Sequence, residues 1–178
     1  MRLKCLMCQL LGSVCVTFTM LVLMIVLVPP TEAAAQGAAE IPQPAVVMFY
    51  NEVDILQTAR IIDAEYGSCP SLKEKASVAW VVCNRARDGR WSGNISEVIF
   101  QPNQFHTAGM PAQPSAESLM IAQDVLMRWN LEMNGAGDVG RTIPPEVCFF
   151  KGDGKKNHFS DRNSGGNIYE PVLGPYYN

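Results

Sequence analysis

Histidine is scarce in this chain of 178 residues, which contains only His106 and His158. A zinc peptidase or amidase holds its metal with paired histidines, as in HExxH, and these two histidines have no such spacing. A catalytic cysteine needs a histidine beside it, and no cysteine here lies in the local sequence of a known thiol enzyme family. The sequence therefore disfavours a metallopeptidase, an amidase and a Cys–His enzyme, and it predicts no metal and no cofactor.

The chain also lacks a basic stripe. It has 14 Lys and Arg against 17 Asp and Glu, which gives a net charge of −3. This balance argues against nucleic acid or an anionic membrane surface as the partner. It does not favour an acidic polymer either. Any contact with a glycan would therefore consist mostly of hydrogen bonds and stacking.

The N-terminal segment is typical of a secretory signal. Arg2 and Lys4 precede an almost uninterrupted apolar run at 8–28, and two prolines and small residues suited to cleavage follow. The run is also just long enough to span a bilayer, so membrane attachment through an uncleaved anchor is the alternative. The net charge becomes −4 without residues 1–39, because that segment holds one more base than acid. We predict three parts: a signal peptide or membrane anchor at 1–35, a Pro- and Ala-rich linker at 36–50, and a secreted or membrane-anchored extracytoplasmic domain at 51–178.

Cysteine is sparse outside the N-terminal segment, where Cys69, Cys83 and Cys148 remain. An odd number outside the cell is most simply explained by one disulfide and one free or intermolecular thiol. The spacings of these three residues match no zinc pattern. Cys83 lies on the apolar face of a predicted helix, where it is either a core residue or half of a bridge to Cys69. Both interpretations stay open.

Three amphipathic patterns predict the main helices. The first covers 52–66, where apolar residues recur at spacings of four, three and four. The second begins after Ser71, which forms a capping-box pattern with Glu74, and it ends near Gly89. This second helix is apolar nearly all round, as expected for the core helix of the domain. The third covers about 115–130, with a serine as its cap.

Short apolar runs bounded by glycine and proline predict a small β element. We expect a short helix at 95–99 and strands at 147–150 and around 168–173. The stretch 152–159 is interpreted as a turn-rich loop whose acidic residues lack calcium-loop spacing. The patterns thus predict a mostly helical domain without internal repeats.

Glu65 lies near the end of the first predicted helix, three residues after Ile62 and four after Ile61, so its carboxyl is expected beside the buried face. Asp63 is turned about 200° away and is expected to meet water. Ionising a carboxyl beside apolar groups costs hydration, so such an acid keeps its proton to higher pH and suits general acid catalysis. The alternative is a boundary glutamate whose side chain bends to reach solvent.

Several segments together resemble the SleB/CwlJ cell wall hydrolase family, whose familiar members are the spore cortex-lytic enzymes of germination. The resemblance covers about residues 55–160, and the tail 149–159 resembles one branch of the family. Its main segments are Ala64-Glu65 at the end of one helix, Asn84-Arg85 at the end of the next, and 95–99 leading to Gln104-Phe105.

This resemblance implies an α+β, mostly helical, lysozyme-like fold with a small β element. It implies cleavage of the bond between N-acetylmuramic acid and N-acetylglucosamine in peptidoglycan by one glutamate, here Glu65. Gln104 and Phe105 would line the glycan groove, because sugars offer C–H faces for stacking and polar groups for hydrogen bonding. Candidates on the opposite wall are Phe150, Asn157 and Phe159, although a phenylalanine such as Phe159 would equally suit core packing.

The implied partner is the glycan strand in the cell wall of a Gram-positive bacterium. Whether the target is spore cortex or vegetative wall, and whether a partner protein activates the enzyme, stays open. The chain departs from the family at Glu65-Tyr66-Gly67-Ser68-Cys69, where the family usually has Glu-Ala-Arg-Gly-Glu or Glu-Ala-Arg-Gly-Cys. We expect Tyr66 to fill the space of the arginine or to close part of the groove.

The reaction type follows from the number of acids. A glycosidase with two carboxylates holds them at a fixed separation, and no acid here is paired with Glu65 in the sequence. One acid suffices if the 6-hydroxyl of the muramic acid attacks the anomeric carbon, which makes the enzyme a lytic transglycosylase with 1,6-anhydro products. By analogy with the family we favour this reaction over a hydrolytic muramidase. The alternative from another class is a non-catalytic peptidoglycan-binding or coat protein of the same fold.

Overall fold

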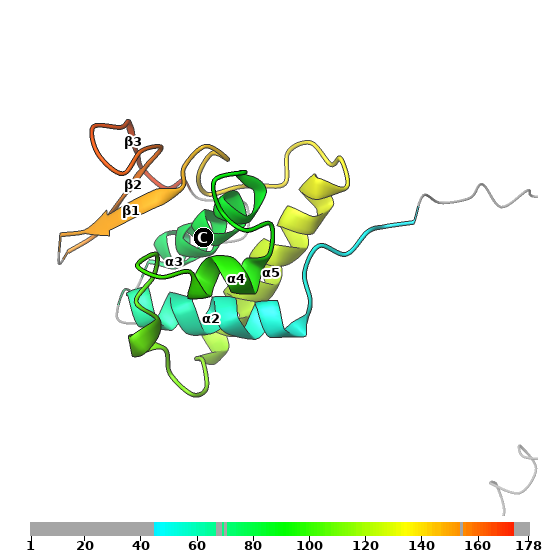
Figure 1. Cartoon of the computed structure of the whole chain (residues 1–178), viewed down its shortest axis with the longest axis horizontal. Coiled ribbons are helices and arrows are strands. Elements are labelled where there is room, and N and C mark those ends of the chain that lie inside the picture. The colour runs from blue at the N-terminus through cyan, green and yellow to red at the C-terminus, as the bar shows by residue number, and fades with distance from the viewer. Residues whose placement is uncertain (1–44, 67–68, 70, 154, 173–178) are drawn as a thin grey trace, which may run out of the picture. The chain divides into compact units, whose positions relative to one another are not determined.

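The computed structural model describes residues 45–66, 69, 71–153 and 155–172, which belong to one compact unit that begins at Ala45. Figure 1 shows the helices of this unit gathered together, with the strands at one side. The predicted signal or anchor lies outside the described residues. Among the helices that are described, none combines the length and the apolar character needed to cross a bilayer. The elements are α2 (Glu52–Tyr66), α3 (Leu72–Arg87), α4 (Ile95–Phe100), η1 (Thr107–Gly109), α5 (Ala116–Met133), β1 (Phe149–Gly152), β2 (Asn157–Ser160) and β3 (Ile168–Tyr169).

Helix α3 is the core helix, as its sequence predicts. Every residue from Lys75 to Ala86 is buried, and α2, α4, α5 and β1 all pack against this helix. Valine and alanine cover most of its circumference, so each neighbouring element meets an apolar surface. The two largest buried side chains are Trp80 of α3 and Trp129 of α5. The α+β, mostly helical class with a small β element is therefore confirmed.

The capping box predicted at the start of α3 is wrong. Ser71 is the N-cap residue, but its side chain makes no capping hydrogen bond. The carboxylate of Glu74 instead accepts hydrogen bonds from the Tyr66 hydroxyl and from the Asn157 backbone N–H. Glu74 thus joins the end of α2 to the start of β2, a contact between segments far apart in the sequence.

The N-terminus of α5 is capped as predicted and is reinforced by a residue of α2. The Ser115 hydroxyl accepts from the Ser118 N–H at 3.1 Å. Asp63 in turn accepts from the N–H and the hydroxyl of Ser115 and from the hydroxyl of Ser118, at 2.6, 2.9 and 2.6 Å. Asp63 is partly exposed, as expected, and its carboxylate also binds the N-terminus of α5, where the helix dipole stabilises a negative charge.

The strands form an antiparallel sheet in the order β1-β2-β3. Strand β1 starts two residues later than predicted, and β2 lies in the stretch predicted to be a loop. The local sequence hides β2 because asparagine, histidine and serine have low strand propensity. The strand forms because Phe159 points into the core with no exposed surface, while Phe150 pairs opposite it in β1.

The last residues of the predicted linker dock on the end of α5. The side chain of Asn134 bonds both the N–H and the carbonyl of Val47, and Asn130 accepts from the Phe49 N–H at 2.9 Å. The Phe49 ring meets the edge of Trp129 with ring centres 6.2 Å apart. Residues 47–49 therefore belong structurally to the domain.

The structure excludes the disulfide between Cys69 and Cys83. The Cys69 sulfur accepts from the Ser71 N–H at 3.3 Å, which places it at the start of α3. Cys83 lies twelve residues after Ser71 in the same helix, a distance of about 18 Å at about 1.5 Å per residue. The Cα atoms of a disulfide lie within about 7 Å of each other. Cys69, Cys83 and Cys148 are all free thiols.

A chain that begins at residue 36 should therefore contain three reactive thiols once it is unfolded without reductant. In the folded chain iodoacetamide should modify Cys69 alone, because Cys83 and Cys148 have no exposed surface and burial raises the pKa of both thiols. Mass spectrometry of the alkylated protein counts the modified cysteines. A single reactive thiol after unfolding would contradict the structure.

Candidate active site

Glu65 lies in the last turn of α2 with its side chain half-buried. Its Oε1 atom accepts a hydrogen bond of 2.5 Å from the backbone N–H of His106. Its Oε2 atom accepts none from the described part of the chain. The carboxyl group is thus fixed at one oxygen against the loop that follows α4.

Arg85 near the end of α3 holds this loop in place. Its Nε donates to the Cys148 carbonyl at 2.8 Å, and its Nη1 donates to the Gln104 carbonyl at 3.3 Å. The guanidinium carbon lies 4.5 Å from the centre of the Phe105 ring, a cation–π contact. The residue is only 4% exposed, so burial lowers the pKa of Arg85 to about 10, while Cys148 and Glu65 favour its charged form. The guanidinium therefore stays charged at neutral pH.

The family resemblance included Arg85 through the pair Asn84-Arg85, but the helix pattern placed this arginine simply in the last turn. The neighbouring Trp91 was not predicted for the site either. Its indole N–H donates to the Gln104 Oε1 at 3.2 Å, and its ring lies 5.5 Å from the Arg85 guanidinium. Arg85 directly follows the mostly apolar stretch 76–83 of α3, and a charged residue in that position is the signal in the sequence for a buried partner.

The predicted aromatic residues form a row from the loop into the sheet. The ring centres of Phe105 and Phe150 are 6.2 Å apart, and those of Phe150 and Phe159 are 5.9 Å apart. Phe105 and Phe150 keep partly exposed surface, so both remain candidates for sugar contacts. Phe159 has no exposed surface, so its assignment to the groove wall is wrong: it fills the core beneath the sheet.

Asn157 is also buried rather than displayed on a wall. It is 5% exposed, and its backbone N–H donates to Glu74 at 3.2 Å. Its side-chain Nδ2 is enclosed and has no hydrogen-bond partner among the described residues. The predicted sugar contact of Asn157 is wrong for this conformation, because strand β2 turns the side chain inward.

Tyr66 and Gln104 each use a polar atom for an internal contact. The Tyr66 hydroxyl donates to Glu74, and burial together with this carboxylate raises the pKa of the phenol. The Tyr66 ring packs against the core. Gln104 accepts from Trp91 through its side chain and from Arg85 through its carbonyl. Tyr66 directly follows Glu65 in the chain, and Gln104 lies on the loop that bonds Glu65. The contacts of both side chains are internal and shape the site.

The other acids considered from the sequence are held elsewhere. Asp63 caps α5 and Glu74 accepts from Tyr66. Glu97 accepts from the Ser92 hydroxyl, and Asp124 pairs with Arg128 at 2.8 Å. Over the described residues no group of three or more metal-ligating side chains comes together. Each of these four acids is therefore engaged by another part of the fold.

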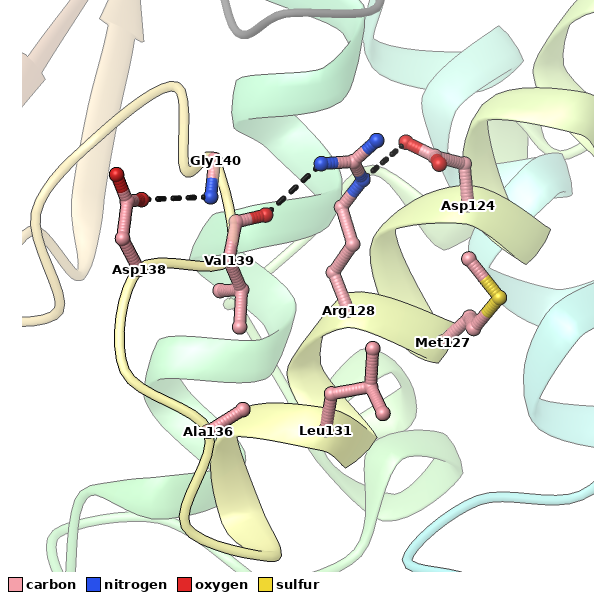
Figure 2. Close-up of a pocket in the computed structure, with 8 residues that line it drawn as sticks. All are labelled: Asp124, Met127, Arg128, Leu131, Ala136, Asp138, Val139 and Gly140. Carbon is pink, nitrogen blue, oxygen red and sulfur yellow. Dashed lines mark hydrogen bonds and ion pairs between the residues drawn. The ribbon is translucent and has the colours of Figure 1, made fainter.

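Two pockets lie away from Glu65. One, of about 400 Å³, lies between α5 and the segment after it, and Figure 2 shows the Arg128 side chain between Asp124 and the Val139 carbonyl at its edge. The other, of about 490 Å³, contains Trp91 and Phe100 at the end of α4 and therefore adjoins the loop bonded to Glu65.

Comparisons with known proteins give one family match and two similar solved structures. A model of the cell wall hydrolase family matches residues 71–137, a little over a third of the chain. This stretch starts after Glu65 and includes α3, α4 and the Gln104-Phe105 loop, so the resemblance seen in the sequence is confirmed there. A comparison with curated proteins gives no match.

Two solved structures are similar to the chain. One is the catalytic domain of the SleB protein of Bacillus cereus, at 21% identity over 58% of this chain and 73% of that chain, with a TM-score of 0.44. The other is the catalytic domain of the germination-specific lytic transglycosylase SleB from Bacillus anthracis, at 21% identity over 57% of this chain and 75% of that chain, with a TM-score of 0.45.

The role of Arg85 can be tested with Arg85→Lys. Lysine keeps the charge but cannot donate in two fixed directions while it stacks on a ring, so we expect a loss of about 1–3 kcal/mol in the free energy of unfolding and shifted amide NMR signals for 104–106. The matched control is Arg87→Lys, whose half-exposed side chain pairs with Glu132 at 2.9 Å on the same helix. That substitution should cost less than about 0.5 kcal/mol. Equal losses in the two variants would contradict the role of Arg85 in holding the loop at 104–106.

Proposed function

We propose that this chain is a peptidoglycan-cleaving enzyme that acts on the bond between N-acetylmuramic acid and N-acetylglucosamine, with Glu65 as its acid–base residue. The observation that carries the proposal is the position of Glu65. One carboxyl oxygen is fixed by the His106 N–H, and the other is unengaged beside a loop that offers Phe105. The family matched by residues 71–137 is described as a cell wall hydrolase, which agrees with this substrate.

The lytic transglycosylase reaction needs only this acid. Protonated Glu65 would donate its proton to the glycosidic oxygen as the bond to the anomeric carbon breaks. The 6-hydroxyl of the same muramic acid would attack that carbon from within the sugar. The Glu65 carboxylate would then accept the hydroxyl proton, which restores the acid and leaves a 1,6-anhydro ring. No water is consumed.

The engagement of the other acids supports this reaction over hydrolysis. A hydrolytic muramidase of the usual kind places a second carboxylate about 5–10 Å from the first to act as nucleophile or base. The four other acids are engaged with other groups of the fold. Hydrogen bonds hold Asp63, Glu74 and Glu97, and an ion pair holds Asp124. An attacking hydroxyl supplied by the substrate removes the need for such a partner.

The N-terminal segment would bring the domain to its substrate. A signal or an anchor at 1–35 places the rest of the chain outside the membrane, where peptidoglycan lies. The negative net charge of −3 for the whole chain agrees with contacts to sugars that consist of hydrogen bonds and stacking rather than of charge pairing.

Glu65→Gln should reduce the lysis of purified peptidoglycan at least about 100-fold, the scale of general acid–base catalysis. Glutamine still accepts from the His106 N–H, so the melting temperature should change little. Glu52→Gln is the matched control, because Glu52 lies exposed in the first turn of the same helix. Turbidity loss of cell-wall sacculi measures the rate. Undiminished lysis by Glu65→Gln would exclude Glu65 as the catalytic acid.

The released products distinguish the reaction types. We expect mass spectrometry of digested glycan to show muropeptides lighter by one water than their reducing counterparts, because the anhydro ring retains no added water. Reducing ends alone would indicate a hydrolytic muramidase with a second acid. Sedimentation of the protein with sacculi without any released fragment would instead indicate a non-catalytic binding protein.

A further inference from the structure

An open pocket of about 490 Å³ lies where the end of α4 meets the loop after α3. Phe100, the last residue of α4, keeps 52% of its side chain exposed there although it is large and apolar. The pocket combines this ring with a tryptophan and with several polar groups. Its lining residues are Arg90, Trp91, Ser92, Glu97, Phe100 and Gln101.

Ring and guanidinium contacts support the aromatic side of the pocket. The Trp91 ring lies 5.6 Å from that of Phe149, and the Arg90 guanidinium lies 4.6 Å from the Trp91 ring centre. Arg90 is oriented by Asp88, which it meets with two side-chain hydrogen bonds of 2.9 and 2.8 Å. A ring and a guanidinium that are fixed in this way can bind a ligand without a large loss of side-chain entropy.

The polar side offers both donors and acceptors. Glu97 is exposed and already accepts from the Ser92 hydroxyl, so its carboxylate is held at the edge of the pocket. The Gln101 side chain can donate and accept. Flat apolar rings beside planar polar groups are the surface on which a sugar ring can lay its C–H face while its hydroxyl and acetamido groups form hydrogen bonds.

The pocket does not include Glu65, but it is linked to Glu65 through the loop that follows α4. Trp91 donates to the side chain of Gln104, and Gln104 stands two residues before His106, whose N–H bonds Glu65. Two residues span at most about 7 Å of chain. A polymer with one linkage at Glu65 would therefore meet this pocket only with sugars further along the loop.

We propose that this pocket is a distal subsite for the glycan strand, in which a sugar ring stacks on Phe100 while Arg90, Glu97 and Gln101 bind its polar groups. The inference rests on the proposed function and extends it, because it predicts that affinity rises with the length of the strand. The occupant is the glycan itself rather than the stem peptide. The lining combines an aromatic face, on which a sugar ring can stack, with neutral and charged groups that bind hydroxyl and acetamido groups.

Tryptophan fluorescence provides a direct readout of occupancy. Trp80 and Trp129 are 0% and 2% exposed, so Trp91 is the partly exposed tryptophan and the one that acrylamide should quench. The probe is a series of glycan strands from short to long, with the stem peptides removed, added to the full-length Glu65→Gln protein so that no cleavage occurs. Long strands should protect Trp91 from acrylamide, and the shortest should not.

Phe100→Ala tests the stacking contact. It should weaken the binding of long strands about fivefold and remove most of the dependence of affinity on strand length, the scale of one lost aromatic contact. The control is Met120→Ala, because Met120 on α5 is 69% exposed and lies outside the pocket. It should leave affinity and melting temperature unchanged.

Three outcomes would overturn the subsite: equal affinity for short and long strands, an unchanged length dependence in Phe100→Ala, or protection of Trp91 only by strands that keep their stem peptides. Each of these leaves the lysis assay of Glu65→Gln untouched. Conversely, protection of Trp91 that depends on strand length together with full lysis by Glu65→Gln would support the subsite and reject the assignment of Glu65.

Discussion

The buried guanidinium of Arg85 is the interaction on which the candidate site depends. It lies at the end of the core helix and joins the Cys148 carbonyl before β1 to the Gln104 carbonyl of the loop that meets Glu65. A buried charge is tolerated only when its donors are satisfied, so the loop and the start of the sheet must take positions that satisfy it. The position of the His106 N–H, and through it that of Glu65, follows from this requirement.

The acids near Glu65 in the chain differ from Glu65 in their hydrogen bonds. Asp63 leaves the site to cap α5, and Glu74 ties the end of α2 to β2 through Tyr66 and Asn157. Asp63 and Glu74 thus hold elements together, whereas Glu65 keeps one oxygen that accepts no hydrogen bond from the described residues. A mechanism with a single acid agrees with this division.

The departure from the family sequence next to Glu65 has a structural explanation. Tyr66 stands where the family usually has Ala, just before its Arg, and its hydroxyl bonds Glu74 while its ring packs on the core. These two contacts give Tyr66 a structural role at the end of α2. The predicted capping box does not form, because the Ser71 N–H donates to the Cys69 sulfur and Glu74 accepts from Tyr66 and Asn157.

The sequence by itself determined the helices, because the periodicity of apolar residues in α2, α3 and α5 is a local property that survives in any context. It also identified Glu65 and the Gln104-Phe105 loop, through resemblance. Only the tertiary structure decided which candidates face the site. Asn157 and Phe159 lie two residues apart on the same face of strand β2, and both are buried: the Asn157 N–H donates to Glu74, and Phe159 packs in the core. The contact between Arg85 and Gln104 joins residues of different elements, and no local pattern encodes such a pairing.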